Sequence, residues 1–350
     1  MNITCVIMAG GIGERFWPKS RIKKPKQCLS IFSEKSLIEE TIDRLSPFVP
    51  NDRIFISTNK QVADLIKEKV NTINDGNYII EPLRRNTAPC IGLSAIYVEK
   101  NYPNSIMIIV PSDHYIKDKE NYFRHLEKAV EMAEKNIVLI GIKPTYASTA
   151  LGYIRNGKIV DSKGIKVYKV EKFFEKPNIA QAKKFLRSGN YLWNSGMFIC
   201  KTNLILDAIK KYIPDLHEGL EKIKKSDFDN EVMKNVFKNL KPESATSIDF
   251  GVMEKADNLY MVKGEFYWND VGDWKAMDLV LNKDKDGNVI GDNVINIDSK
   301  NNIIFSDKLL TTIGVRDLII IQDDDCVLVC DKERSQDVKK LLEKLDKKHL

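Results

Sequence analysis

The N-terminal part of the chain alternates short apolar runs with longer amphipathic stretches. The apolar runs have the length and composition of buried strands and lie at residues 3–9, 53–58, 78–81, 105–110 and 137–142. The amphipathic stretches predict helices, the first of them opened by a capping box at Ser36–Glu39 and ending near Leu45, the others at 61–70, 88–100 and 122–135. This alternation predicts an α/β fold with a mostly parallel sheet and helices on both faces. Such sheets bind ligands at the loops that follow their strands.

Beyond residue 150 the pattern is less regular. Short strands at 166–174, 197–200 and 260–262 mix with helices at 179–187 and 204–212, as expected of a lobe inserted on, or appended to, the first sheet. A polar, turn-rich stretch at 282–287 marks a boundary, and six short β runs and a helix at 335–345 follow it. We therefore predict a large domain at 1–283, in two halves that meet near residue 145, and a small β domain at 284–350. The β domain is suited to packing on another surface, and we expect a homodimer.

Composition narrows the class of protein. The chain has 350 residues, of which 43% are hydrophobic and 30% charged, with a formal net charge of +6. These values exclude wholesale disorder and fibrous repeats. No apolar stretch approaches the roughly 18 residues that span a bilayer, and the first residues lack a basic signal-peptide region. We expect a cytoplasmic protein without a membrane partner. The six cysteines form no CxxC pair, which argues for reduced thiols and against structural zinc.

A glycine-rich loop follows the first strand. Gly10, Gly11 and Gly13 let the backbone approach a ligand closely, so that its N–H groups can hold phosphate oxygens. The loop lacks the Lys-Ser/Thr pair of a Walker A motif, and Phe16 stands where a dinucleotide-binding motif has its third glycine. Six cations follow without an acidic residue among them: Arg15, Lys19, Arg21, Lys23, Lys24 and Lys26. Beside a glycine loop they predict a polyanion, most simply a triphosphate.

Two other interpretations of this basic segment are a solvated surface and a nucleic-acid patch. Nucleic-acid surfaces usually add stacking aromatics and a wider basic stripe, so we expect no nucleic-acid partner. Trp17 is expected to pack in the core.

Polar residues also follow the third and fourth strands. Glu81, Asn86 and Thr87 could face a base, although a helix start capped by Thr87 is the plainer interpretation. Asp113 comes directly after a buried β run, where parallel sheets place ligand or metal carboxylates; a helix cap or turn is the alternative. The neighbouring His114 is at least as well explained by a structural hydrogen bond.

Three later clusters are compatible, taken singly, with ordinary turns. They are a Glu-Lys pair at 175–176 just before a helix capped by Asn178, small polar residues joined to an apolar strand at 193–198, and two carboxylates between tryptophans at 268–274.

Taken together and in this order, the segments resemble one known family. They are 10–20 (GGIGERFWPKS), 25–27 (PKQ), 85–89 (RNTAP), 111–114 (PSDH), 175–177 (EKP), 193–198 (WNSGMF), 247–254 (SIDFGVME) and 268–274 (WNDVGDW). The chain resembles the mannose-1-phosphate guanylyltransferases, members of the sugar nucleotidyltransferases, over nearly its whole length. The resemblance implies a Rossmann-like, glycosyltransferase-A-like nucleotidyltransferase fold with a β-helix-like C-terminal domain, residues 1–145 forming the nucleotide half and 146–283 the sugar-phosphate half.

The same resemblance implies that GTP and α-D-mannose 1-phosphate are converted to GDP-mannose and pyrophosphate with Mg²⁺. The catalytic residues would be Arg15, which holds the triphosphate, Lys26, near the scissile bond, and Lys176, at the sugar phosphate. The nucleotide-binding residues would be Ala9, Gly10, Gly11, Gly13, Glu81, Asn86, Thr87 and Ser112, of which Glu81, Asn86 and Thr87 lie near guanine or ribose. Glu175 and Asn194 would bind sugar hydroxyls, and Asp113 and Asp270 the metal.

The chain departs from the family pattern at two positions, Cys28, where phenylalanine is common, and Asp273, where serine is common; we favour Asp270 over Asp273 as the metal ligand. Some family members carry a fused sugar-phosphate isomerase domain, and that activity is not expected here. Three other functions stay open from the residues: the same chemistry on another sugar 1-phosphate, a non-catalytic GDP-sugar-binding regulator and, most weakly, an NAD-dependent oxidoreductase.

Overall fold

A computed structural model describes residues 2–349, which pack into two compact units. The first contains the chain up to Gly10, Ile42–Pro111 and Ile116–Tyr267. The second contains Gly11–Thr41, Ser112–Tyr115 and the chain from Trp268 onward. Packing therefore groups the glycine-loop segment with the C-terminal part of the chain. The predicted boundaries at residues 145 and 283 stay predictions.

The first unit is built on a nine-stranded sheet with the order β3-β2-β1-β4-β9-β6-β10-β8-β7. The strands are β1 (Ile3–Met8), β2 (Ile54–Thr58), β3 (Tyr78–Ile80), β4 (Ile106–Pro111), β6 (Ile137–Ile142), β7 (Tyr153–Asp161), β8 (Val167–Phe174), β9 (Tyr191–Lys201) and β10 (Leu259–Gly264). The first four strands of this order are parallel, whereas β9 runs against both β4 and β6. The predicted α/β fold is confirmed, with β9 as a reversed strand in its middle. The long β7, whose outer half is exposed, was not predicted.

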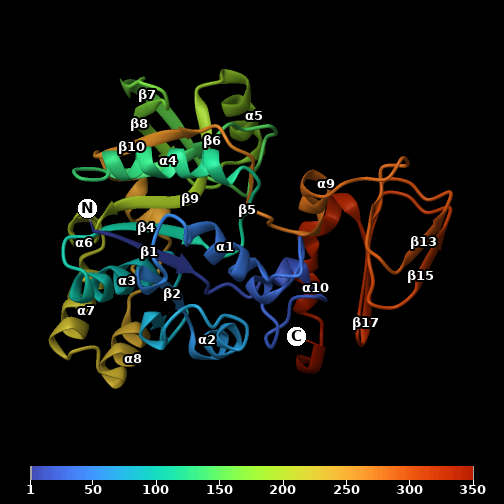
Figure 1. The fold of residues 1–350 in the computed structure, drawn as a ribbon, viewed down its shortest axis with the longest axis horizontal. Coiled ribbons are helices and arrows are strands. Elements are labelled where there is room, and N and C mark those ends of the chain that lie inside the picture. The colour runs from blue at the N-terminus through green and yellow to red at the C-terminus, as the bar shows by residue number, and fades with distance from the viewer. Residues whose placement is uncertain (1, 350) are drawn as a thin grey trace. The chain divides into compact units, whose positions relative to one another are not determined.

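Helices cover both faces of this sheet. They are α2 (Lys60–Lys67), α3 (Thr87–Asn101), α4 (Lys119–Met132), α5 (Ile179–Ser188), α6 (Thr202–Tyr212), α7 (Pro214–Lys225) and α8 (Asn230–Asn239), while α1 (Leu37–Leu45) passes from the second unit into the first. In Figure 1, α3, α6, α7 and α8 gather below β1 and β4, and α4 lies on the other side, near β6 and β10. Every residue from Ile106 to Val110 of β4 is at most 3% exposed. Such a strand needs cover on both faces, which explains its unbroken apolar sequence.

Helix starts follow the local sequence closely. Asn178 and Gln181 form the capping box of α5, so the predicted cap is confirmed. At α3 the prediction was wrong, because Asn86 is the cap and accepts a hydrogen bond from the Thr87 N–H. Asn86 lies at φ 72°, a left-handed backbone that Asn tolerates better than a β-branched Thr would. None of the described helices is long and apolar enough to cross a membrane.

The second unit carries a small coil of parallel strands closed by one antiparallel strand, β17 (Cys326–Asp331); it is here called the β coil (residues 289–331). Its strands are β12 (Val289–Ile290), β13 (Val294–Ile297), β14 (Ile303–Phe305), β15 (Leu310–Ile313), β16 (Leu318–Asp323) and β17 (Cys326–Asp331). β12, β14 and β16 pair in parallel as successive turns, as do β13 and β15. Asn288 and Asn302 bridge neighbouring turns, since the Asn302 Nδ2 donates to Asn288 Oδ1 at 3.0 Å. The β-helix-like prediction is confirmed.

Short elements complete the second unit: β5 (Tyr115–Ile116) paired with β11 (Trp268–Asn269), α9 (Met277–Val280) and α10 (Val338–Leu342). The predicted terminal helix is shorter than expected, because 3₁₀ turns occupy 332–337. Phe16 and Trp17 pack in one apolar cluster with Trp274 and the inner side chains of the β coil. Trp17 is 5% exposed, as predicted for a core residue. The segment after the glycine loop and the β coil thus share a core.

Candidate functional site

In the second unit the glycine loop packs directly over Lys26. Gly13 has φ 80°, and a Cβ atom there would lie 2.2 Å from the Lys26 Cβ, so only glycine fits. The Lys26 N–H donates to the Ile12 carbonyl at 3.0 Å. An ideal Cβ on Gly11 would meet no described atom within 4 Å, which leaves room for a ligand beside the loop.

Lys26 is the centre of a polar cluster beneath this loop. The side chain is 5% exposed, and its Nζ donates to Asp113 Oδ2 at 2.7 Å and to the Val271 carbonyl. The Asp113 carboxylate is 31% exposed, so small ligands can reach it. Burial acts to raise the pKa of Asp113, but the Lys26 ammonium outweighs it and holds that pKa below its ordinary value. Asp113 is therefore an ionised oxygen donor beside a fixed cation.

Asp270 is the second carboxylate of this cluster. Burial raises its pKa to about 6; Lys26 opposes that rise, while the charges of Asp113 and Asp273 add to it. The following residue, Val271, has φ 48°, a strained backbone for a β-branched residue. Strain of this kind persists where the surroundings enforce it, often at ligand sites. Here it turns the Val271 carbonyl toward Lys26.

Two neighbouring titratable side chains, Asp273 and His114, form hydrogen bonds within the second unit. The Asp273 carboxylate accepts hydrogen bonds from the Ala276 N–H, the Ser335 hydroxyl and the Gln336 amide, so its oxygens are engaged within the unit. His114 Nδ1 accepts a hydrogen bond from Trp268 Nε1 at 3.2 Å. The hydrogen bonds of Asp273 are consistent with the prediction that Asp270, and not Asp273, is the metal ligand. The hydrogen bond of His114 fits the interpretation of that residue as structural.

The six cations after the glycine loop do not share one role. Among residues 2–349, Arg15 Nε is buried and has no hydrogen-bond partner, so it is a donor that a bound anion would satisfy. Lys19 and Arg21, in contrast, form ion pairs with aspartates of the β coil. The sequence interpretation of all six as one polyanion site was therefore wrong for these two. Ser112 lies in the same unit, buried, and its carbonyl accepts from the Thr41 hydroxyl at 3.1 Å.

In the first unit a buried carboxylate ends β3. Glu81 is 7% exposed, and its Oε1 lies 3.5 Å from the Ser57 hydroxyl. Burial raises the pKa of Glu81, opposed by its hydrogen bonds with Cys90 and Ser57. A Cβ on Gly10 would lie 3.5 Å from the same oxygen, so glycine leaves one side of the carboxylate uncovered. Ala9, just before it, is fixed to β2 by a 2.8 Å hydrogen bond from its N–H to the Ser57 carbonyl.

The Arg-Asn-Thr-Ala-Pro loop is held by its neighbours. Arg85 Nε donates to the Phe237 carbonyl at 2.8 Å, at the end of α8. The Thr87 hydroxyl accepts from the Ile248 N–H at 2.9 Å, while the Asn86 side chain is exposed. Of the predicted pair, Asn86 thus faces solvent and Thr87 fastens the loop to the segment before Asp249.

Predicted sugar-binding residues meet at the ends of β7, β8 and β9. The Glu175 side chain is 7% exposed, and Lys176 Nζ lies 2.8 Å from its Oε1. A Cβ on Gly152 would approach Glu175 Oε2 to 2.6 Å and the Asn194 Cβ to 3.3 Å. These two side chains therefore pack against Gly152, where a larger residue would clash. Lys176 itself has φ 46° and an ammonium that is largely exposed, ready to meet an anion.

Asp249 completes this group, and the sequence analysis gave it no role. Asn194 Nδ2 donates to Asp249 Oδ1 at 2.9 Å, and Asn194 Oδ1 accepts from the Gly196 N–H at 3.1 Å. Burial raises the pKa of Asp249 to about 7, and the nearby Glu175 adds to the rise. The residue opens a π-helical turn at Asp249–Met253, a form often found at functional sites. A lone aspartate within the apolar run 248–253 was the available signal.

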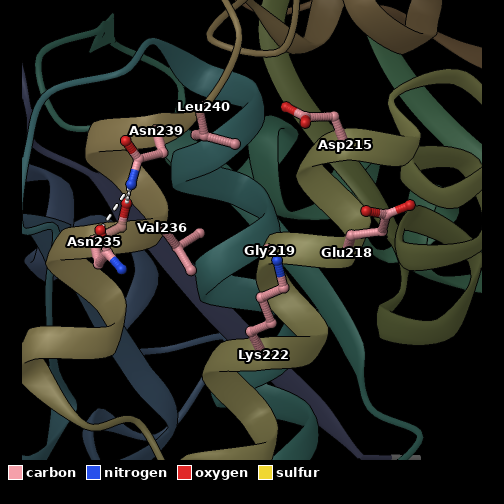
Figure 2. A pocket seen from close by; sticks show the side chains of 8 residues that line it. All are labelled: Asp215, Glu218, Gly219, Lys222, Asn235, Val236, Asn239 and Leu240. Atoms are coloured by element: carbon pink, nitrogen blue, oxygen red, sulfur yellow. Dashed lines mark hydrogen bonds between the residues drawn. The ribbon is translucent and has the colours of Figure 1, made fainter.

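Figure 2 shows a cavity elsewhere in the first unit, between α7 and α8. Its volume is about 140 Å³, and its lining includes Asp215, Lys222 and Asn239 but none of the predicted site residues.

Two family comparisons fit this geometry. Residues 4–286 match the family described as nucleotidyl transferase, and residues 292–345 match the family described as MannoseP isomerase/GMP-like beta-helix domain. The first match covers most of the chain, so the class of protein is a nucleotidyltransferase.

Curated relatives narrow the class. The chain is 36% identical to mannose-1-phosphate guanylyltransferase 2 of Escherichia coli O157:H7, over 98% of this chain and 73% of that protein. It is 37% identical to mannose-1-phosphate guanylyltransferase of Klebsiella pneumoniae, over 97% of this chain and 73% of that protein. The chain belongs to the mannose-1-phosphate guanylyltransferase family.

A solved structure supports the fold over the whole chain. The crystal structure of a Thermus thermophilus protein, described as mannose-1-phosphate geranyltransferase, matches with a TM-score of 0.89 and 32% identity. The match covers 98% of this chain and 99% of that one. The roles of individual residues stay predictions.

Proposed function

We propose that the protein transfers GMP from GTP to α-D-mannose 1-phosphate, giving GDP-mannose and pyrophosphate. The observation that carries this proposal is the cluster of Lys26, Asp113 and Asp270 beneath the glycine loop. It combines a buried cation, two oxygen donors and a backbone that only glycine can adopt. Transfer of a nucleotidyl group between two anions requires such fixed charges and hydrogen-bond donors.

Mg²⁺ is part of the proposal, and the residues fit it. Mg²⁺ is commonly held by one or two carboxylates together with substrate phosphates. Asp113 and Asp270 offer hard oxygen donors; burial raises the pKa of Asp270, and the charge of Asp113 adds to that rise. When bound, the ion would neutralise phosphate charge and polarise the reacting phosphate.

Two anions must approach each other in this reaction, and the chain supplies cations to permit it. Lys26 would meet phosphate oxygens beside the bond that breaks, exchanging its present bond to Asp113 for them. Arg15 would direct its unpartnered Nε at the triphosphate. The N–H groups of Gly11 and Gly13 would bind further oxygens. The attacking phosphate oxygen is already ionised near neutral pH, so no general base is required.

The first unit would select the two substrates. Glu81, buried and open on the side of Gly10, would accept hydrogen bonds from guanine or ribose. Glu175, Asn194 and Asp249 would bind sugar hydroxyls, and Asn194 and Asp249 are already joined by a hydrogen bond. Lys176 would meet the sugar phosphate with its exposed ammonium.

A substrate panel with pyrophosphate detection tests the proposal. Purified protein is given GTP, ATP, UTP or dTTP with the 1-phosphates of mannose, glucose, N-acetylglucosamine or a heptose. We expect the highest kcat/KM for GTP with mannose 1-phosphate, and no turnover after chelation of Mg²⁺. A higher kcat/KM with another sugar 1-phosphate would mean that the enzyme carries out the same reaction on that substrate instead of on mannose 1-phosphate. GDP-mannose binding without turnover of any pair would favour a regulator instead.

A homodimer remains part of this proposal. The outer face of β13 and β15 exposes Ile295, Ile297 and Ile313, each more than half exposed. Light scattering coupled to size exclusion would give twice the chain mass, and a strict monomer would reject the dimer. A cytoplasmic location and the lack of nucleic-acid and membrane partners stay expectations.

A further inference from the structure

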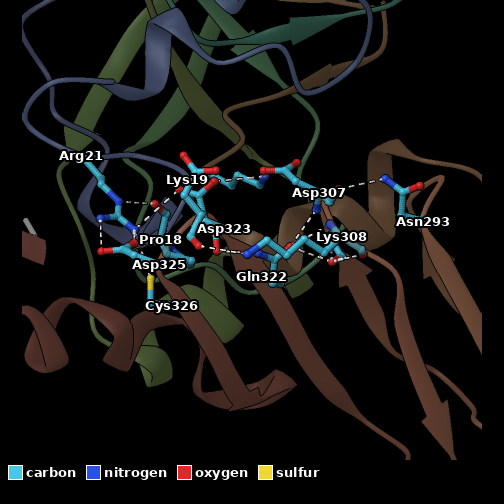
Figure 3. A network of polar contacts seen from close by, with 12 residues as sticks. Pro18, Lys19, Arg21, Asn293, Asp307, Lys308, Gln322, Asp323, Asp325 and Cys326 are labelled. Atoms are coloured by element: carbon cyan, nitrogen blue, oxygen red, sulfur yellow. Dashed lines mark hydrogen bonds and ion pairs between the residues drawn. The ribbon is translucent and has the colours of Figure 1, made fainter.

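Two cations of the basic segment are bound by the β coil of the same unit. Figure 3 shows Lys19 and Arg21 facing three aspartates, here called the acidic cluster: Asp307, Asp323 and Asp325. Lys19 pairs with Asp307 and lies 3.3 Å from Asp323, and Arg21 lies 3.6 Å from Asp323 and pairs with Asp325. The cluster therefore joins segments about 300 residues apart in sequence.

Asp323 makes this contact more than a surface ion pair. Its side chain is 7% exposed and lies between the two cations, each 16% exposed. A buried carboxylate that loses its compensating cations strongly destabilises the folded state. Lys19 and Arg21 are thus held where they are, because moving either would remove one of the two cations that compensate Asp323.

Arg21 is fixed from several sides. Its Nη2 and Nη1 both bond Asp325, its Nε donates to the Pro18 carbonyl at 3.0 Å, and Nη2 reaches the Cys326 sulfur at 3.1 Å. The bond to Asp325 raises the pKa of Arg21 and holds the pKa of Asp325 well below its usual range. A guanidinium bound in this planar, two-pronged way fixes direction as well as distance.

The fixed arginine lies just before the catalytic lysine. Arg21 and Lys24 exchange two backbone hydrogen bonds of 3.0 Å and form a tight turn. Pro25 follows, and the next residue is Lys26, whose N–H bonds the Ile12 carbonyl under the glycine loop. Four residues thus separate Arg21 from Lys26, and the closed turn takes up most of them.

We propose that Asp323 and Asp325 of the β coil are positioning residues for nucleotidyl transfer: they anchor Arg21 and the Arg21–Lys24 turn, and thereby set Lys26 and the glycine loop for the triphosphate. The inference rests on the proposed function and deepens it. The β coil would thus contribute to the nucleotide site through Arg21 and the Arg21–Lys24 turn.

Kinetics separate positioning from stabilisation alone. The variants are Asp323→Asn and Asp325→Asn in the full chain, with Glu333→Gln as control. Glu333 forms an exposed ion pair with Lys275 in the same unit and, within residues 2–349, makes no hydrogen bond or ion pair with the turn or with Lys26. We expect the KM for GTP to rise and kcat to fall, together lowering kcat/KM for GTP about 10- to 100-fold, the scale of a displacement near 1 Å. The KM for mannose 1-phosphate should stay within about twofold.

Hydrogen exchange gives a readout that does not depend on turnover. Both variants should speed exchange of the amides of Arg21, Lys24 and Lys26, while amides of β1 and β4 keep their wild-type rates. Arg21→Lys keeps the charge but loses the two-pronged bond. The exchange rates of these amides in Arg21→Lys should therefore lie between those of the wild type and those of Arg21→Ala.

Each outcome decides the inference. A lower melting temperature with unchanged GTP kinetics and unchanged exchange at the turn would overturn it. If the buried change Asp323→Asn prevents folding, Asp325→Asn, at a carboxylate 43% exposed, decides in its place. If the wild-type protein turns over no substrate pair, the proposed function fails first, and GTP binding measured calorimetrically on the same variants still tests the positioning.

Discussion

The proposed phosphate-binding region and the proposed sugar-binding region place their side chains by different means. Lys26, Asp113 and Asp270 come from turns and from a strained backbone at Val271, held in place by hydrogen bonds and by the β coil. Glu175 and Asn194 lie on or beside paired strands, where the pleat itself fixes direction. The turns hold the charged groups that would bind the many oxygens of a triphosphate. The paired strands provide a rigid frame, which is suited to recognising the stereochemistry of one sugar.

The two regions also differ in electrostatics. The first combines one buried cation with carboxylates, of which Asp113 has its pKa lowered and Asp270 has its pKa raised by burial. The second has a raised pKa at Asp249 and an exposed ammonium at Lys176. Substitutions in the first region should therefore act on the chemical step, and those in the second on selection of the sugar.

Lys26→Ala should have the largest effect, a fall in kcat of about 10²–10³-fold, because a fixed charge at the reacting phosphate is lost. Steady-state pyrophosphate release measures it. Lys234→Ala, at an exposed cation of α8, serves as the control and should stay near wild type. A Lys26→Ala enzyme within twofold of wild type would remove Lys26 from the catalytic residues.

Asp270→Ala should abolish the Mg²⁺-dependent part of the activity with the fold intact. The loss is expected to be about 100-fold at saturating Mg²⁺, because a hard oxygen ligand is removed. The matched variant is Asp273→Asn, whose carboxylate is bonded to Ser335 and the 3₁₀ turn. It should lower the melting temperature and leave the Mg²⁺ titration of turnover unchanged. If Asp273→Asn changed the Mg²⁺ titration and Asp270→Ala did not, Asp273 and not Asp270 would be the metal ligand.

Much of the fold could be predicted because its strands are short buried runs between recognisable helices. The strand at Ile137–Ile142 was predicted with its exact bounds, and the Asn178 cap correctly started α5. The reversed direction of β9 could not be predicted, because strand direction depends on tertiary pairing and leaves no mark in the local pattern. β7 was missed because its outer half is exposed and mixes polar residues with Ile159 and Val160, so it is not a buried apolar run.

The candidate site was predictable where residues follow buried strands, as Asp113 and Glu81 do. The partners of Lys19 and Arg21 were not, because their aspartates lie about 300 residues away and no local spacing indicates them. Asp249 was missed for a similar reason. Its environment is made by Asn194 and Glu175, which reach it only through the folded sheet.

Glu81→Gln should have an intermediate effect, raising the KM for GTP about tenfold, because a charged hydrogen-bond acceptor is lost from a buried position. Comparing GTP with ITP, which lacks the 2-amino group, separates the two expected locations. Contact with guanine predicts that the preference for GTP over ITP narrows, whereas contact with ribose predicts equal losses. Glu68→Gln, at the exposed end of α2, is the control. An unchanged KM for GTP would remove Glu81 from the nucleotide-binding residues.

The smallest expected effect tests the electrostatics of the sugar-binding region. The pKa of Asp249 is about 7 in the folded protein and near 3.8 in the unfolded chain. Between these values the folded state holds the proton more tightly, so the free energy of unfolding falls as pH rises from about 4 to 7. Asp249→Asn has no proton to lose and should lack this fall.

Urea unfolding at pH 5 and pH 8 measures the difference. After allowance for solvent screening at this partly exposed group, the wild type should lose about 1 kcal/mol more than Asp249→Asn between the two pH values. Asp257→Asn, at an exposed carboxylate a few residues further on, should behave as wild type. Parallel curves for wild type and Asp249→Asn would mean that Asp249 is ionised at both pH values. The second region would then hold its sugar with two fixed negative charges, and the electrostatic contrast between the regions would be smaller than the geometry indicates.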